Sequence, residues 1–458
     1  MYKIDFEKPI HIHFIGIGGI SMSGLAEILL KEGFTVSGSD SRKSPLTIQL
    51  EEKGAQIFYG QKAENIIDGI QCIVYTAAIS RDNAELIEAV SKKIPMLSRA
   101  ELLGQLMKNY ETPIAVSGTH GKTTTTSMIS HILLEGKTDP TISVGGILKA
   151  IGGNIRVGSS GTFITEACEY TNSFLHFFPK ISVILNVEED HLDFFKDLED
   201  IRHSFHQFAA LLPADGTLVL NADIKDSSEI CDGLNCHIIR YGSSADADYS
   251  ARNIQYDEKG RVSFDLVRRG TLAEHIALSV TGDHNVSNAL SSIAVAELLH
   301  IPMDVIQKGL LSFSGTDRRF EYKGTVGGVT IVDDYAHHPT EITATLKAAQ
   351  HYPHQKLWCV FQPHTYTRTK AFFREFAEAL SHADHVVLAD IYAARETDTL
   401  GISSQDLAGE IRTLGTDVHY FPSFNDIENF LRTNCSSGDL LITMGAGDVV
   451  NIGEDLLK

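Results

Sequence analysis

Gly118-Thr-His-Gly-Lys-Thr-Thr-Thr-Thr126 stands between an apolar run at 113–117 and a helical pattern at 128–134. A strand, a glycine turn, a Lys-Thr pair and a helix in this order are typical of a phosphate-binding loop. The backbone N–H groups at the start of such a helix point at the anion. Lys122 adds a positive charge near the outer phosphates, and the Thr123 hydroxyl can bind a divalent metal.

This loop is a shortened variant of the usual motif. The pattern G-x-x-x-x-G-K-[ST] would place its first glycine at position 116, which is Val116. A Gly-Lys-Thr turn that only caps an ordinary helix is the alternative, and the preceding strand argues against it. We expect nucleotide phosphates to bind along one continuous segment, made up of Gly118, Thr119, His120, Gly121, Lys122, Thr123 and Thr124.

Composition predicts a soluble cytoplasmic protein of about three domains, because the chain has 458 residues, of which 43% are hydrophobic and 21% charged. The net charge of −20 argues against a general nucleic-acid binder. The six cysteines form no C-x-x-C pair, which is typical of reduced thiols. The N-terminus lacks the apolar core of a signal peptide, and no apolar run is long enough for membrane insertion.

Strand and helix patterns alternate along most of the chain, which predicts an α/β protein with mainly parallel sheets. Polar stretches at 109–112 and 314–317 predict boundaries between domains 1–110, 111–315 and 316–458. From about 248 to 280 the pattern is β-rich, with a hairpin turn at Asp257-Glu-Lys-Gly260. Other predicted elements are helices at 20–31, 98–108, 286–299 and 303–311, and strands at 10–15, 72–75, 162–165, 181–185, 329–332, 357–361 and 440–443.

A second glycine turn follows the first predicted strand. It resembles a dinucleotide-binding fingerprint, except that Ser21 stands where the third glycine is expected. Asp40 lies at a plausible distance along the chain to meet a ribose hydroxyl. A glycine-rich turn that serves only packing is the alternative. We expect a nucleotide or pyrophosphate here, bound by Gly16, Gly18, Gly19, Ser21 and Asp40.

Two possible metal ligands follow predicted strands of the central segment. Glu166 comes after the strand at 162–165, and His191 comes after the strand at 181–186. Ligands gather at the carboxyl ends of parallel strands, so both side chains are expected beside Thr123. Such a set suits magnesium bound to ATP phosphates. Nearby acids remain competing ligands, namely Glu169, Glu188, Glu189, Asp190 and Asp193.

Polar groups also follow two predicted strands of the third segment. The first group is Asp333-Asp-Tyr-Ala-His-His-Pro339, and the second is Gln362-Pro-His-Thr-Tyr-Thr-Arg368. Their placement after neighbouring buried strands favours a site over two unrelated loops. Arg318 and Arg319 lie just beyond the second domain boundary, where they are expected to reach nucleotide phosphates.

These motifs occur together and in order over essentially the whole chain, which resembles the Mur ligases. The resemblance is closest to the members that act on L-alanine. It implies a three-domain α/β architecture, with an N-terminal Rossmann-like domain for the UDP-sugar, a central P-loop ATPase domain and a C-terminal Rossmann-like domain for the amino acid. Besides the two glycine turns, the motifs that carry it are Thr281-Gly-Asp-His-Asn-Val-Ser-Asn288, Gly315-Thr-Asp-Arg-Arg-Phe-Glu321, Asp334-Tyr-Ala-His-His-Pro339 and the segment 361–368.

The resemblance also implies the reaction, in which ATP drives the joining of L-alanine to UDP-N-acetylmuramate through an acyl phosphate. Mg²⁺ is the implied cofactor, and Mn²⁺ is a possible substitute. Thr123, Glu166 and His191 are the implied metal ligands. Lys122, Glu166 and His191 are the implied catalytic residues. Other implied contacts are Asn285, Asn288 and Arg319 for ATP, and Tyr335, His364 and Arg368 for alanine.

Two other functions share parts of this pattern. An enzyme that attaches a recycled tripeptide instead of alanine would use the same ATP chemistry, although the N-terminal glycine turn favours the alanine enzyme. A non-catalytic P-loop switch would need neither the first glycine turn nor the polar groups of the third segment. Oligomeric state, and selectivity for alanine over glycine or serine, are left open by the sequence.

Overall fold

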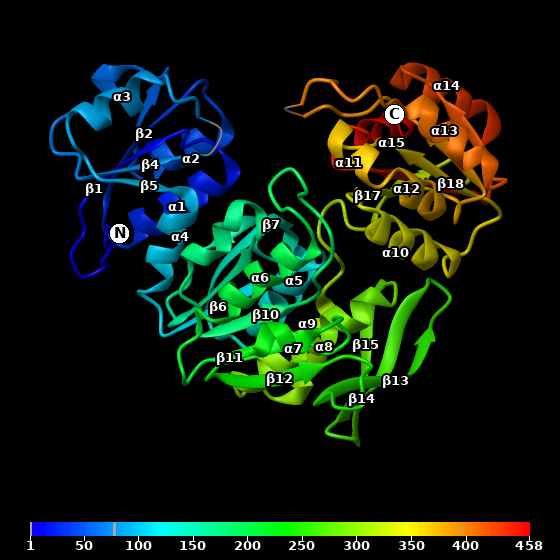
Figure 1. Ribbon diagram of the computed structural model, residues 1–458, viewed down its shortest axis with the longest axis horizontal. Coiled ribbons are helices and arrows are strands. Elements are labelled where there is room, and N and C mark those ends of the chain that lie inside the picture. The colour runs from blue at the N-terminus through cyan, green and yellow to red at the C-terminus, as the bar shows by residue number, and fades with distance from the viewer. Residues whose placement is uncertain (1, 77–78, 395) are drawn as a thin grey trace. The chain divides into compact units, whose positions relative to one another are not determined.

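The computed structural model describes residues 2–76, 79–394 and 396–458, and their strands form three sheets (Figure 1). The chain divides into two compact units. The first unit contains Met1–Glu188, Asp197–Asp246 and Ser291–Ile306, and the second contains Glu189–Lys196, Ala247–Leu290 and Gln307–Lys458. None of the helices in the described residues is long and apolar enough to cross a membrane.

The N-terminal sheet is wholly parallel and has the strand order β3-β2-β1-β4-β5. Strand order reverses direction between β1 and β4, which is where doubly wound sheets bind their ligands. The glycine turn at 16–19 follows β1 at this point. The strands are β1 (His11–Ile15), β2 (Thr35–Asp40), β3 (Gln56–Tyr59), β4 (Cys72–Tyr75) and β5 (Met96–Ser98), and the helices are α1 (Ile20–Lys31), α2 (Pro45–Glu52), α3 (Ala84–Ser91) and α4 (Arg99–Met107).

The central sheet places the phosphate loop between two parallel neighbours. Its strands in the first unit have the order β12-β11-β10-β6-β9-β7-β8, so β10 and β9 flank β6. These strands are β6 (Thr112–Ser117), β7 (Thr141–Leu148), β8 (Gly153–Arg156), β9 (Thr162–Ala167), β10 (Ile181–Ile184), β11 (Thr217–Asn221) and β12 (His237–Tyr241). Helices of this segment are α5 (Lys122–Glu135), α6 (Leu198–Ala209), α7 (Ser227–Cys231), α8 (His284–Leu298) and α9 (Met303–Ser312).

The second unit begins its sheet structure with an antiparallel meander of β13 (Tyr249–Tyr256), β14 (Arg261–Arg268) and β15 (Thr271–Thr281). The C-terminal sheet has the order β16-β17-β21-β18-β19-β20, and only β16 runs antiparallel. Its elements are β16 (Glu321–Val326), β17 (Val329–Asp334), α10 (Pro339–Gln350), β18 (Leu357–Phe361), α11 (Tyr366–Ala371), α12 (Phe373–Leu380), β19 (His385–Leu388), α13 (Ser404–Thr413), β20 (Asp417–Tyr420), α14 (Phe424–Asn434), β21 (Leu440–Met444) and α15 (Val450–Leu456).

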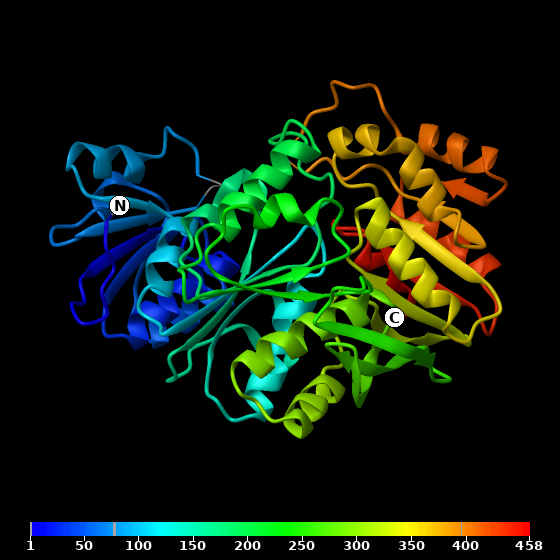
Figure 2. The same cartoon turned by 60° about the horizontal axis from the view of Figure 1, so that its bottom comes forward.

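Two buried clusters lie on the two faces of this C-terminal sheet. Figure 2 shows the helices of this part of the chain, coloured yellow to red, beside its strands. On one face, Ile342 and Leu346 of α10 pack with Phe376 of α12. On the other face, Ile427 of α14 and Ile452 of α15 pack against the sheet. Because alternate residues of a strand point to opposite faces, the strands of this sheet need long apolar runs, and β18 and β21 are buried throughout.

Most predicted elements are confirmed, and two boundaries needed correction. The helix at 20–31, the strand at 72–75 and the hairpin at 257–260 form as expected, with Gly260 N donating to Asp257 O at 2.9 Å. Glu166 was expected after its strand, but β9 continues through Ala167 because Glu166 pairs with Val116 of β6. Asp333 and Asp334 likewise belong to β17. The two boundaries between the three domains stay a prediction.

Candidate active site

The phosphate loop has the predicted strand–turn–helix geometry. Gly118 has φ of 145°, and a Cβ there would approach Leu185 Cβ to 2.9 Å. Gly121 is the N-cap of α5 with φ of 82°, a conformation that favours glycine. His120 N donates to Asn186 Oδ1 at 2.8 Å, which ties the turn to the end of β10. The loop is therefore fixed in shape by its glycines and by the neighbouring strand.

Lys122 begins α5 and turns its ammonium group back over the loop. Nζ donates to the carbonyl of Thr119 at 2.9 Å, to the carbonyl of Gly118, and to Glu169 Oε2 at 3.1 Å. Burial opposes the charge on Lys122, but the neighbouring acids, chiefly Glu169, outweigh it and raise the lysine pKa. Lys122 is thus a fixed cation at neutral pH, and Glu169 is its partner, a role that the sequence did not reveal.

Thr123 and Glu166 meet beside Lys122. The Thr123 hydroxyl donates to Glu166 Oε2 at 3.0 Å, and Gly145 N donates to Glu166 Oε1. The contact follows from the sheet, because β6 and β9 are parallel neighbours and Thr123 lies in the first turn of α5, directly after the loop that follows β6. A hydroxyl and a carboxylate oxygen held together are ligands of the kind that Mg²⁺ prefers.

His191, the third predicted metal ligand, belongs to the second unit. Its backbone N donates to Asp190 Oδ1 at 2.8 Å, and its Nε2 lies 3.7 Å from Asp190 Oδ2. Thr123 and Glu166 belong to the first unit. The assignment of His191 to the same metal therefore stays a prediction.

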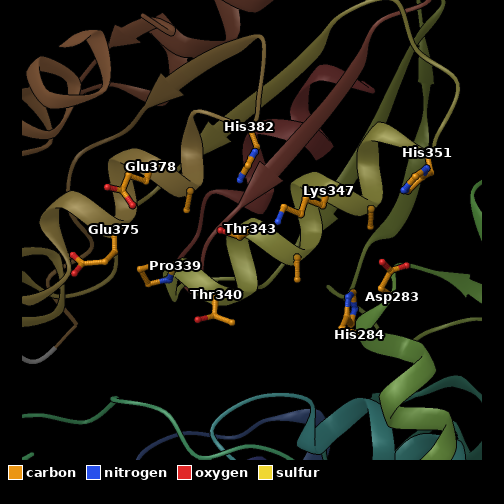
Figure 3. A pocket seen from close by; sticks show the side chains of 13 residues that line it. Asp283, His284, Pro339, Thr340, Thr343, Lys347, His351, Glu375, Glu378 and His382 are labelled. Carbon is orange, nitrogen blue, oxygen red and sulfur yellow. The ribbon is translucent and has the colours of Figure 1, made fainter. Parts of the chain in front are cut away.

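A cavity of about 560 Å³ opens beside the motif at 281–288 (Figure 3). Asp283 and His284 form one side of it, and α10 lies along the other with Thr340, Thr343 and Lys347. α12 contributes Glu375 and Glu378, and the remaining lining includes Pro339, His351 and His382. The cavity has the size of a small-molecule site.

The two predicted asparagines, Asn285 and Asn288, follow the cavity-lining residues Asp283 and His284 in the sequence. They form a hydrogen bond with each other. Asn288 Nδ2 donates to Asn285 Oδ1 at 3.0 Å, and Asn285 Nδ2 donates to Thr281 O at 2.7 Å. Arg319 Nη1 lies 3.6 Å from Glu341 Oε1 of α10. Arg318, by contrast, is bound within the C-terminal sheet, since it donates to Asp333 and to the carbonyls of Gly445 and Gly447.

The three predicted alanine-site residues converge around His337, which the sequence-based assignment omitted. The His337 ring lies edge-on to the Tyr335 ring at 5.3 Å and to the His364 ring at 5.9 Å. Arg368 Nη1 donates to His364 Nδ1 at 3.2 Å. Burial lowers the pKa of His337 to about 4, so its imidazole is neutral at pH 7.

Arg368 also has an acidic partner from a distant segment. Its Nη2 and Nε donate to Asp190 Oδ1 at 2.9 Å and 3.3 Å, and both side chains are largely buried. Burial disfavours the charge of Asp190, but Arg368 and His191 outweigh it and hold the pKa of this carboxyl well below its usual range. Asp190 and Arg368 are 178 positions apart in the sequence, so only the fold brings this pair together.

A hydrogen bond to the Asp40 side chain holds the first glycine turn in its conformation. Ser39 O accepts from the N–H groups of Gly16 and Ile17 at 2.9 Å, and Asp40 Oδ2 accepts from Gly18 N at 2.8 Å. Gly19 is the N-cap of α1 and has no side-chain cap, and Ser21 is exposed on the first turn. Asp40 thus shapes the turn, and its contact with a ribose stays a prediction.

Models of one family match three successive stretches of the chain. "Mur ligase family, catalytic domain" matches residues 11–111, "Mur ligase middle domain" matches 116–296, and "Mur ligase, glutamate ligase domain" matches 318–447. Two relatives are UDP-N-acetylmuramate–L-alanine ligases. The one from Agathobacter rectalis is 62% identical over 458 residues, and the one from Lachnospira eligens is 60% identical over 459, with 100% of each chain covered in both cases.

Solved structures agree with these matches over the full length. A UDP-N-acetylmuramate–alanine ligase from Thermotoga maritima superimposes with a TM-score of 0.80 at 27% identity, covering 98% of both chains. A murein peptide ligase from Psychrobacter arcticus gives a TM-score of 0.69 at 26% identity, again covering 98% of both chains.

Proposed function

Because the chain belongs to the Mur ligase family, we propose that it joins L-alanine to the carboxylate of UDP-N-acetylmuramate and converts ATP to ADP and phosphate. The observation that carries this proposal is identity of 60–62% over the whole chain with ligases of that name. The product is a peptidoglycan precursor. We place the reaction in the cytoplasm, and the six free cysteines are in keeping with a reducing compartment.

The chemistry needs activation of a carboxylate, which is a poor electrophile. A muramate carboxylate oxygen attacks the γ-phosphorus of ATP, the bond to the β-phosphate oxygen breaks, and ADP leaves. The neutral amine of alanine then attacks the acyl carbon, inorganic phosphate leaves, and the nitrogen loses a proton. We assign to Lys122, the first residue of α5, the stabilisation of charge on the transferred phosphoryl group, because such a reaction depends mainly on positioning and electrostatics.

We assign Mg²⁺, with Mn²⁺ as a substitute, to Thr123 and Glu166. Their direct contact supports the assignment, because both offer the oxygen ligands that a hard cation prefers. His191 is the proposed third ligand. When bound, the cation neutralises phosphate charge. The protein groups themselves orient the nucleotide through the loop amides and Lys122.

The amino acid is assigned to the group around His337. The Arg368 guanidinium can bind a carboxylate in two places, and this would orient the amine for attack. Asp190 occupies that guanidinium in the structure, so an alanine carboxylate would compete with it. Asn285, Asn288 and Arg319 are assigned to ATP, with the adjoining cavity as the site of its base.

Omission of single substrates tests the proposal. Release of ADP should require UDP-N-acetylmuramate, and sustained release should also require L-alanine. A nucleotide-dependent switch would release ADP without either compound. A peptide ligase would turn over with the tripeptide in place of alanine, and efficient use of the tripeptide alone would contradict the proposal.

A further inference from the structure

A segment that follows β19 lies along the residues that carry His364 and Arg368. Tyr392 N donates to Pro363 O at 2.8 Å, and Thr365 N donates to Tyr392 O at 2.9 Å. The Tyr392 and His364 rings stack with centroids 5.7 Å apart. Residues of 390–401 that the structure describes therefore contact the segment 362–368, which carries the predicted alanine-site residues. The contacting residues themselves lie outside the motifs that the sequence pointed to.

Glu396, in this same segment, caps the helix that bears Arg368. Its Oε2 accepts from Tyr366 N at 2.7 Å and from Thr367 N at 3.0 Å, and the Thr367 hydroxyl donates to Oε1. These N–H groups are the first two of α11, which have no partner inside a helix. The N-cap residue Thr365 supplies no side-chain cap, so the distant carboxylate takes that role.

The capped helix depends on outside support. α11 has six residues, too few for a helix to be stable alone. Thr365 has φ of 64° and ψ of 147°, a backbone conformation that only surrounding contacts maintain in a residue other than glycine. A guanidinium fork must be held within about 0.5 Å to bind a carboxylate in two places.

We propose that Glu396 is a positioning residue for the amino-acid substrate, because it fixes α11 and thereby the direction of the Arg368 guanidinium. This inference rests on the proposed assignment of Arg368 to the alanine carboxylate. Glu396 itself does not touch the substrate. Its loss should weaken the binding of alanine and leave the nucleotide sites as they are.

Steady-state kinetics of Glu396→Ala and Glu396→Gln test this proposal. Glu396→Ala should raise the KM for L-alanine on the order of 10-fold, as expected for loss of a helix cap that orients a binding group, with a smaller change in kcat. Glu396→Gln should recover part of the loss, because its amide oxygen can still accept from Tyr366 N and Thr367 N. The KM values for ATP and UDP-N-acetylmuramate should stay near those of the parent enzyme.

Asp398→Asn is the matched control. Asp398 is an acid of the same segment, and its Oδ1 accepts from Leu400 N and Gly401 N at 3.0 Å, within its own turn. This variant should leave the KM for alanine unchanged. Thr367→Val removes the hydroxyl that donates to Glu396 and lies 3.5 Å from Thr365 Oγ1. It supplies a milder second test if Glu396→Ala does not fold.

Parallel measurement of Arg368→Lys tests the carboxylate site at Arg368 separately from the positioning role of Glu396. If Arg368→Lys raises the KM for alanine and the folded Glu396 and Thr367 variants do not, the positioning role is refuted and the carboxylate site stands. If none of these variants changes the KM for alanine, Arg368 does not bind the alanine carboxylate, and the positioning role of Glu396 is refuted as well. A parallel rise in all three KM values would show a general structural role and would also overturn the inference.

Discussion

Lys122 is the residue on which, in the proposed reaction, transfer of the phosphoryl group depends. Its ammonium lies at the N-terminus of α5 and is held by loop carbonyls and Glu169. Lys122→Ala should preserve folding and lower kcat/KM for ligation on the order of 100-fold or more, because an oriented cation is lost at the developing charge. Circular dichroism checks folding. Near-normal turnover in the folded variant would refute this role.

Glu166 tests the metal assignment. Glu166→Gln keeps the size of the side chain and removes its charge, so a higher Mg²⁺ concentration should be needed for half-maximal turnover. Binding of the UDP-sugar should change much less. Titration of activity with Mg²⁺ measures the effect, with Glu274→Gln at an exposed position of β15 as a control. Unchanged titrations in both Glu166→Gln and His191→Ala would show that the metal lies elsewhere.

Arg368 tests the amino-acid site. Arg368→Lys retains a positive charge that can pair with Asp190, but it loses the planar fork. We expect a higher KM for alanine, on the order of 10-fold or more, and slower ligation, with small changes in ATP and UDP-sugar binding. If folded Arg368→Lys and Arg368→Ala both keep the parent alanine kinetics, the role of the arginine is only structural, through its contacts with Asp190 and His364.

At the scale of elements, the turn between β17 and α10 carries a pH-dependent contribution to stability. Burial lowers the pKa of His337 from 6.5 to about 4. Between these two pH values the imidazole is mostly protonated in the unfolded chain and mostly neutral in the folded chain. A group with a depressed folded pKa of this kind stabilises the fold fully above 6.5. That contribution is lost as the pH falls toward 4.

Between pH 7.5 and pH 5.0, His337 should therefore remove up to about 2 kcal/mol from the free energy of unfolding. This is an upper value, because 20% of the His337 side chain is exposed and solvent reduces the cost of its charge. Urea denaturation of the parent and of His337→Gln at both pH values measures it. The parent should lose more stability than the variant, and equal losses would contradict the assigned pKa shift.

Elements with a clear period were predictable, and those defined by distant partners were not. α1 was predicted to the residue because its apolar positions recur at helical spacing. β7 was missed, because Gly145 and Gly146 interrupt its pattern. The contact of Gly145 with Glu166 of β9 supports that strand, and no local pattern reveals it.

The candidate site divides in the same way. The approach of Thr123 to Glu166 was predictable, since Glu166 lies at the carboxyl end of β9 and Thr123 lies in the first turn of the helix that follows the parallel neighbour β6. The partners of the two key cations were not. Asp190 reaches Arg368 across 178 positions of sequence, and Glu169 reaches Lys122 across 47. Such pairs arise from tertiary packing, so spacing along the chain carries no signal for them.

At the scale of the whole molecule, the three proposed substrate motifs lie in successive segments of the chain. The N-terminal glycine turn, the central phosphate loop and the C-terminal polar cluster lie on three different sheets. Each follows a parallel strand of its sheet. We infer that UDP-sugar, ATP and amino acid each bind at one such strand end, and that a ligation requires all three.

Transfer of a labelled oxygen tests this account most directly. UDP-N-acetylmuramate with ¹⁸O in its carboxylate is incubated with ATP, Mg²⁺ and L-alanine, and mass spectrometry follows the phosphate and the sugar nucleotide. We expect an alanyl conjugate and one ¹⁸O atom in each phosphate released. Conjugate formation with unlabelled phosphate would contradict activation through an acyl phosphate, and absence of the conjugate would contradict the ligation itself.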